Sequence, residues 1–264
     1  MISTRRNPAR LALLSPILLS LGLVACQTAP AGNSGFLSSY DGLVEREDTL
    51  RASIRERRDD ARAATVERVF LEPSVLVGTV GEGLTDAERS QVLREVDRQV
   101  CYEVSERFTV VDGPTGAARL RTGVTGIGAT GQAGSGVAAV ANVLIPGPGT
   151  VRVPGTTGGL SAESELVVGR NDQVAALAWS RFANVLGTDS PSLSRVGDAL
   201  QMAEPYGDAV GDAISPKDRA VRDIANPDPC ARYGPRTQAA GFVTRVITGV
   251  YVPEINTGAT PPKE

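Results

Sequence analysis

The stretch TDAERSQVLREVDRQVCYEVSERFTVV, residues 85–111, decides the fold, because it predicts a capped helix that runs directly into a strand. Thr85 and Glu88 form a capping box, in which the Thr hydroxyl and the Glu carboxylate satisfy backbone N–H groups at the helix start. Apolar residues then recur at helical spacing and predict one buried stripe: Val92, Leu93, Val96, Val100 and Val104. We expect this helix to end near Arg107 and a short strand to follow over residues 108–111.

Further strands and a second helix are predicted on both sides of this unit. Four stretches are rich in β-branched residues or alternate polar with apolar residues, and are expected to be strands: 66–77, 118–127, 161–169 and 173–182. The last two flank residues 170–172, which predict a hairpin turn. A helix is expected over residues 191–214, kinked or split at Pro205. These elements predict an α/β fold of the α+β kind, with a mainly antiparallel sheet of four to five strands packed on two helices.

The remaining stretches give less definite expectations. Residues 45–62 alternate in charge, and a short exposed helix and a solvated loop both stay open for them. Residues 113–162 hold no acidic residue and many glycines, and the apolar residues 137–145 within them fit a short helix. Residues 242–252 predict a terminal strand. For Trp179 we expect core packing, with a partner-binding surface as the alternative.

The first 25 residues read as an export signal. Three arginines precede the uncharged apolar residues 11–25, a stretch of 15 residues that is shorter than the roughly 20 needed to span a bilayer. The stretch ends in Leu-Val-Ala-Cys, which resembles the bacterial lipobox, so we expect cleavage before Cys26 and acylation, including palmitate, of that residue. Several acyl chains anchor a protein stably. The alternative is an ordinary signal peptide with a cysteine near its cleavage site by chance.

The anchor predicts a location and a domain plan. Gln27 follows Cys26, and by analogy with enterobacterial sorting we expect the outer membrane, with the domain facing the periplasm. The plan is a signal peptide, a lipidated cysteine with a flexible tether, an α/β domain and a C-terminal extension with a disordered end: residues 1–25, 26–34, 35–214 and 215–264. Removing residues 1–25, which hold three arginines and no acidic residue, lowers the net charge from −3 to −6. This charge gives no reason to expect nucleic acid as a partner.

The chain has 264 residues, three cysteines and no histidine. The missing histidine excludes Ser-His-Asp and Cys-His nucleophile pairs and any His-ligated metal. Once Cys26 is acylated, Cys101 and Cys230 remain in an oxidising compartment, so we predict a disulfide between them. The alternative is a pair of buried free thiols.

Several features together resemble one known family. They are the lipobox, the motif Gly-Phe-Leu-Ser-Ser-Tyr-Asp-Gly-Leu at residues 35–43, and the order strand, capped helix, strand, long strand, glycine-rich loop, Glu-containing hairpin and helix. The family is the Gram-negative lipoprotein family known as domain of unknown function 3313, and the resemblance spans residues 35–214. It implies a location and a small α/β sandwich. It implies no activity, because none is assigned to the family.

Three patterns in the sequence are candidates for a catalytic, cofactor or metal site. Residues 126–131 match G-x-G-x-x-G, but no acidic residue lies near enough downstream to bind a ribose, so we expect a glycine loop and no cofactor. Glu163 and Glu165 leave one strand face together, a spacing that suits glycoside hydrolysis and, more commonly, a polar strand face. Three aspartates lack the spacing of a calcium loop, so we expect an acidic helix face and no metal: Asp208, Asp212 and Asp218.

The sequence therefore predicts a protein that is not an enzyme. We expect an outer-membrane-anchored periplasmic lipoprotein that binds or assembles another envelope component, with the membrane reached through its lipid anchor. Two alternatives of other classes stay open. One is a carboxylate-based glycan-active enzyme, which needs two carboxylates converging in a cleft. The other is a carrier of a small lipid or ligand, which needs an apolar cavity between sheet and helices.

Overall fold

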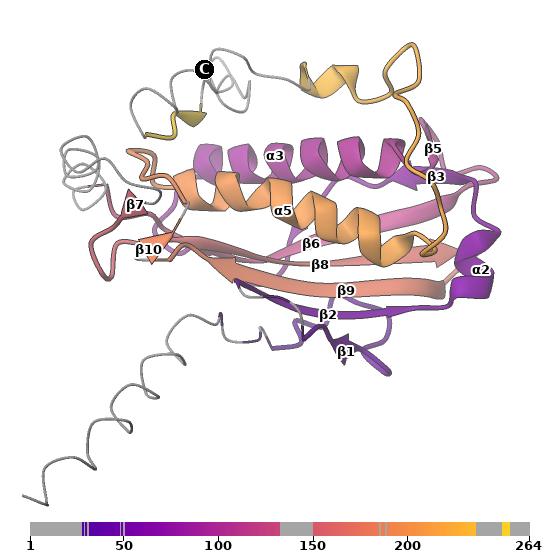
Figure 1. Ribbon diagram of the computed structural model, residues 1–264, viewed down its shortest axis with the longest axis horizontal. Helices are drawn as coiled ribbons and strands as arrows, with labels where there is room; N and C mark the ends of the chain where they lie inside the picture. Colours follow the sequence, from indigo (N-terminus) through magenta and orange to yellow (C-terminus); the bar gives the residue numbers. More distant parts are fainter. Residues whose placement is uncertain are drawn as a thin grey trace, which may run out of the picture.

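The computed structural model describes residues 32–47, 51–132, 150–184, 189–235 and 250–253, together with residues 28, 30, 49, 186 and 187. A large twisted sheet carries two long helices on one face, and the two helices run in the same direction (Figure 1). The strands are β1 Val44–Glu45, β2 Ala52–Arg58, β3 Arg68–Leu71, β4 Val75–Leu76, β5 Thr109–Val111, β6 Ala118–Gly128, β7 Thr150–Val151, β8 Gly159–Val168, β9 Asp172–Phe182 and β10 Leu186–Gly187. The helices are α2 Asp60–Ala64, α3 Asp86–Ser105, α5 Gly197–Ile214 and the short 3-10 helix η2 Ala231–Tyr233.

The sheet has eight strands in the described ranges and mixes both pairings. Its order is β1-β2-β9-β8-β6-β3-β5, with β4 paired to β6, while β7 and β10 form a separate two-stranded sheet. Neighbours from β1 to β6 are antiparallel, and β3 runs parallel to both β5 and β6. The prediction of an α/β fold with two packed helices is confirmed at that level. The prediction of four to five mainly antiparallel strands is wrong, because the sheet is larger and its β3–β5 side is parallel.

Much of the difference comes from β2, which occupies part of the charge-rich stretch expected to be a helix or a loop. Its seven residues pair with β9 along their whole length, from Ala52 opposite Arg181 to Arg58 opposite Ala175. Of these seven, only Ser53 and Ile54 are buried. β2 lies next to the edge of the sheet, where long charged side chains remain in contact with water. The charge alternation therefore concealed a strand.

The capped helix forms as the sequence predicts. Thr85 Oγ1 accepts a hydrogen bond from the N–H of Glu88 at 3.2 Å, and Glu88 Oε2 accepts one from the N–H of Thr85 at 2.7 Å. Four of the five stripe residues are buried: Val92, Val96, Val100 and Val104. The helix ends at Ser105, two residues before the expected position, and the strand β5 follows.

The second helix is shorter than predicted and continuous. α5 begins at Gly197 rather than at residue 191, and Pro205 lies inside it without splitting it. Leu193, which lies within the predicted helix, precedes the observed one and is 58% exposed. Two glycines of α5 allow close contact with α3: a Cβ on Gly207 would lie 2.9 Å from the carbonyl carbon of Gln99. The helices thus cross with almost no side chain between their backbones at this point.

The core lies between the sheet and the two helices. Trp179 of β9 and Tyr206 of α5 are both buried, and their ring centroids are 5.4 Å apart. This confirms the prediction of core packing for Trp179. The hydroxyl of Tyr206 contacts Ser164 Oγ at 2.6 Å, and Ser164 contacts Thr122 at 2.8 Å, so three polar side chains in the core satisfy one another.

The C-terminal extension is stapled onto α3. Cys101 and Cys230 form the predicted disulfide, with Cα atoms 5.9 Å apart, and both are buried. Further along, the hydroxyl of Tyr102 donates to the carbonyl of Gly234 at 3.0 Å, and the guanidinium of Arg219 lies 4.4 Å from the centre of the Phe108 ring. Residues 216–235 are therefore held against the domain at Arg219, Cys230 and Gly234.

Several predictions lie outside the described residues. They are the signal peptide with Cys26, the short helix at 137–145, the disordered end at 257–264 and most of the terminal strand at 242–252. Of that strand, Tyr251 forms an isolated parallel bridge with Ser192. No helix in the described ranges combines the length and the apolar character that crossing a bilayer requires.

Candidate functional site

The motif at residues 35–43 covers the sheet face opposite the helices. Small residues leave room for it there: Ala176 and Ala178 of β9 pair with Glu165 and Glu163 of β8, and Gly123 of β6 pairs with Glu163 on the other side. Cross-strand partners share a face, so this set forms one surface. A Cβ on Gly123 would lie 2.8 Å from the ring of Phe36, which shows how closely the motif approaches the sheet.

Glu163 binds the start of this segment. Its carboxylate accepts hydrogen bonds from the N–H of Ser34 at 3.2 Å, from Ser34 Oγ at 2.6 Å and from the Tyr40 hydroxyl at 2.6 Å. The glutamate is 2% exposed. A buried carboxylate is stable only when hydrogen bonds or counter-charges replace its water, and the N-terminal segment supplies these donors.

Glu165 binds the middle of the motif and is fully buried. It accepts from the N–H of Ser38 at 2.7 Å, from Ser38 Oγ at 2.9 Å and from Gln173 Nε2 at 2.7 Å. Arg121 makes an ion pair with it from β6. The same guanidinium lies 5.1 Å from the centre of the Phe36 ring, so Arg121 ties the carboxylate and the motif together.

The two carboxylates therefore hold the N-terminal motif to the sheet. The two glutamates share one polar face of β8, as their spacing predicts, and the motif buries this face. Each carboxylate receives at least three hydrogen bonds from the protein itself, an arrangement that fixes a segment in place. The sequence pointed to the motif and to the two glutamates, but as unrelated features. The serine and tyrosine hydroxyls of residues 34–40 were the signal that could have linked them.

The chain upstream of the motif also contacts the sheet. Thr28 Oγ1 donates to the carbonyl of Arg51 at 2.8 Å and accepts from the N–H of Phe182 at 3.4 Å. Arg51 precedes β2 and Phe182 ends β9, so Thr28 lies at one end of the two strands. The tether predicted for residues 26–34 is thus attached to the domain at Thr28 and again at Ser34.

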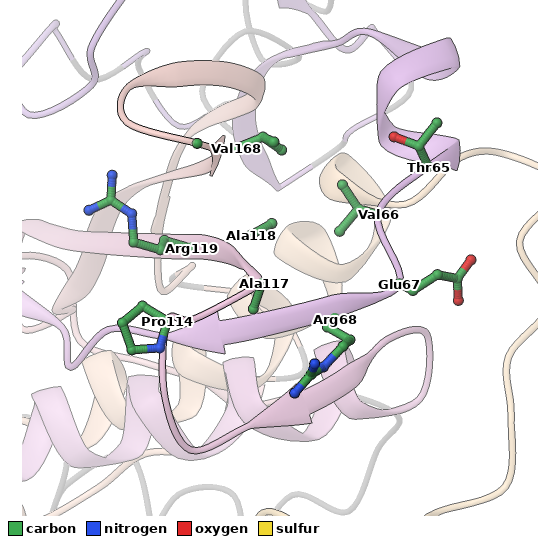
Figure 2. A pocket seen from close by; sticks show the side chains of 11 residues that line it. Thr65, Val66, Glu67, Arg68, Pro114, Ala117, Ala118, Arg119 and Val168 are labelled. Atoms are coloured by element: carbon green, nitrogen blue, oxygen red, sulfur yellow. The ribbon is translucent and has the colours of Figure 1, made fainter.

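A surface hollow lies at the opposite end of β9. It has a volume of about 530 Å³ and is formed where the chain leaves α2, the turn before β6 and the β8–β9 hairpin meet. Figure 2 shows Val66, Ala117, Ala118 and Val168 around it, with Arg68 and Arg119 at its margin. Arg119 is paired with Glu72 at 3.2 Å, and Arg68 is exposed. The hollow combines apolar walls with charges of both signs, because the exposed Glu67 also lines it.

A buried ion pair holds the ends of the glycine-rich stretch in place. Nothing in the sequence pointed to this pair. Arg152 and Asp198 are both completely buried and are bonded twice, at 2.5 and 2.9 Å. Asp198 also accepts from the N–H of Gly158 at 2.7 Å, and its own N–H donates to Thr130 Oγ1. The ends of the glycine-rich stretch are therefore fixed at the first turn of α5.

The remaining two candidate patterns are the G-x-G-x-x-G match and the three aspartates. The glycine loop expected for residues 126–131 is wrong at its start, because Gly126 and Gly128 lie in β6, where a Cβ on Gly128 would be 2.9 Å from the backbone of Gly159. Asp212 pairs with Arg107 at 3.1 Å. Burial, followed by the charges of Glu103 and Glu204, raises the pKa of Asp208 to about 7. In the described part of the chain, no three Cys, Asp or Glu residues are arranged to hold a metal ion.

Comparisons with known proteins point to one family. A family model described as "Protein of unknown function (DUF3313)" matches residues 32–210. No curated protein matches the sequence. Among solved structures, a PelC dodecamer from Paraburkholderia phytofirmans is 10% identical, with a TM-score of 0.35, over 65% of this chain and 99% of that one. A variant of the same dodecamer is 11% identical, also with a TM-score of 0.35, over 63% and 99% of the two chains.

Proposed function

Because the chain belongs to the DUF3313 family, as its motifs predicted, and members of this family are described as proteins of unknown function, we propose a function from this chain's own residues. The protein is a lipoprotein anchored in the outer membrane through acylated Cys26, with its α/β domain in the periplasm. The domain is a non-enzymatic module that binds another component of the cell envelope.

The attachment of the N-terminal segment to the sheet carries this proposal. Thr28, two residues after Cys26, is bonded to the ends of β2 and β9. Two residues span at most about 7 Å, so the acyl chains attached to Cys26 would begin close to the domain surface. The bonds to Glu163 and Glu165 then fix residues 34–40 to the sheet. Such a domain keeps one orientation at the membrane, which suits a module that presents a fixed surface to a partner.

The engagement of the paired glutamates favours binding over glycan hydrolysis. A glycosidase needs two carboxylates that reach the sugar from a cleft. Here Glu163 and Glu165 are buried beneath the motif, and each already accepts hydrogen bonds from it. Their role in this fold is to hold the chain behind the anchor.

The packing between sheet and helices likewise favours binding at the surface over transport of a ligand inside the domain. Trp179 and Tyr206 fill the space between β9 and α5, and Leu160, Leu166 and Leu200 are buried in the same core. The 530 Å³ hollow lies at the sheet end and not in this layer. We place the partner's contact there, because its apolar walls suit an apolar segment of a partner.

In-cell photo-crosslinking tests the binding function. A photoreactive amino acid replaces Arg68 in the hollow, and the matched control replaces Glu82, an exposed residue in the turn before α3. The proposal predicts a reproducible adduct with one envelope protein at position 68 and none at position 82. Adducts of equal pattern at both positions, or none at either, would contradict it.

Cell fractionation tests the anchor. Cys26→Ser should move the protein from the outer-membrane fraction to the soluble periplasm, because it removes the acylated thiol. The control Thr28→Ser keeps a hydroxyl at the strand ends and leaves the anchor intact. A Cys26→Ser protein that stays in the outer membrane would overturn the assignment.

A further inference from the structure

Phe182 leaves an apolar ring exposed at the end of β9, on the side where the N-terminal segment meets the sheet. Its ring is 45% exposed, while its backbone N–H donates to Thr28. The ring lies over two glycines of the neighbouring strands. A Cβ on Gly159 would be 2.6 Å from the ring, and one on Gly128 would be 3.1 Å from it. The absence of side chains on β8 and β6 at this level gives the ring its place on the sheet surface.

One charge next to this ring is neutralised. Arg181 precedes Phe182 on β9 and makes an ion pair with Asp189 at 2.5 Å, in which both side chains are largely buried. An exposed aromatic ring is suited to the boundary between lipid headgroups and acyl chains.

The position of the anchor indicates that a lipid bilayer lies next to this surface. Thr28 bonds to Phe182 and stands two residues after Cys26, so acyl chains on Cys26 begin within about 7 Å of Thr28. A bilayer that holds those chains necessarily comes close to this end of β9. The other end of the strand, at Asp172, is ten residues away, which corresponds to about 33 Å along a strand.

We propose that this end of the sheet is a membrane-contact surface, in which Phe182 enters the lipid interface beside the acyl anchor. The inference rests on the proposed function, because it requires the lipid on Cys26. It adds an orientation: the β8–β9 hairpin and the hollow next to it point away from the bilayer, towards partners in the periplasm.

Fluorescence quenching by spin-labelled lipid tests this orientation on the full-length, processed protein. The protein is placed in phosphatidylethanolamine–phosphatidylglycerol vesicles that contain a lipid with a nitroxide near its headgroup. An environment-sensitive fluorophore is attached to Phe182→Cys, and the matched control is Val168→Cys, an exposed apolar position at the far end of the β8–β9 pair. The native cysteines do not compete for label, because one is acylated and the other two form the disulfide.

The proposal predicts a loss of fluorescence at position 182 that clearly exceeds the loss at position 168. Equal quenching at the two positions, or stronger quenching at 168, would overturn it. Asn184→Cys provides a second reporter at the same end if Phe182→Cys does not fold. Mass spectrometry of the same sample separates the two proposals: an acylated, vesicle-bound protein without quenching at 182 refutes this orientation alone, and a protein without acyl chains refutes both.

Discussion

The hydroxyl of Tyr40 donates to Glu163 Oε2 at 2.6 Å, and this bond joins residues that are 123 positions apart in the sequence. The hydroxyl oxygen of Tyr40 also accepts from the N–H of Gly35 at 2.8 Å and from that of Leu37 at 3.3 Å. One phenol therefore shapes the N-terminal motif and attaches it to the sheet. The domain is closed on this side by a segment that begins next to the predicted membrane anchor.

Removing this hydroxyl tests the attachment. Tyr40→Phe should lower the free energy of unfolding by about 1.5–3 kcal/mol, because a buried carboxylate loses a donor. A double-mutant cycle with Glu163→Gln, measured by urea denaturation, should show coupling between the two positions of at least about 0.5 kcal/mol. Tyr40→Phe combined with Glu82→Gln, an exposed and distant change, serves as the additive control. Additivity in both cycles would mean that the bond contributes nothing.

The disulfide gives a second prediction. The pair Cys101–Cys230 spans 129 positions, and the chain-entropy model assigns a loop of that size about 4–5 kcal/mol. Cys101→Ser together with Cys230→Ser should lower stability by that order and expose residues 216–235 to proteolysis. Alkylation of the denatured protein without reductant should leave both cysteines unmodified, whereas buried free thiols would react once unfolding exposes them. Rapid alkylation of both would contradict the bond.

The buried ion pair of Arg152 and Asp198 gives a third prediction. Arg152→Met leaves the carboxylate of Asp198 buried without its counter-charge and should cost about 3–5 kcal/mol. Arg46→Met breaks a partly exposed pair with Glu56 and should cost less than about 1 kcal/mol. Both losses are measured by urea denaturation. A loss for Arg152→Met as small as that for Arg46→Met would show that the pair does not hold the glycine-rich stretch.

The stability of the domain should depend on pH in an uncommon direction. Burial raises the pKa of Glu95 to about 7 from an ordinary value of 4.5, although Arg98 beside it acts in the opposite sense. The folded state therefore binds a proton that the unfolded state releases, and Asp208 acts in the same direction. This contribution is fully present below about pH 4.5 and is lost as the pH rises through about 7.

Urea denaturation at a series of pH values measures this effect. From the Glu95 contribution we expect greater stability at about pH 5 than at about pH 8, and Glu95→Gln should flatten the dependence because it removes the titrating group. Glu82→Gln, at an exposed position, should leave the dependence unchanged. A wild-type protein whose stability rises over this interval, or a Glu95→Gln variant with the wild-type profile, would contradict the prediction.

Local signals in the sequence predicted the elements that depend on local physics. The capping box of Thr85 and Glu88 fixed the start of α3, and the valine stripe identified its buried face. The hairpin of β8 and β9 followed from alternation on both sides of a polar turn. The disulfide followed from the cysteine count, because the predicted lipobox accounts for Cys26 and leaves two cysteines.

The same local signals could not predict contacts between segments that are distant in the sequence. β2 carries Arg55, Glu56, Arg57 and Arg58, which look like a solvated stretch until β9 is placed beside them. The burial of Glu163 and Glu165 depends on donors more than 120 residues earlier in the chain. The Arg152–Asp198 pair likewise joins two distant segments, and neither residue stands out in its own neighbourhood.

The intact mass of the protein purified from membranes decides whether Cys26 is the lipid anchor. We expect a chain that begins at Cys26 and carries a diacylglycerol on the thiol and an acyl chain on the amine. A chain that keeps residues 1–25, or one that begins near Cys26 without any acyl chain, would contradict it.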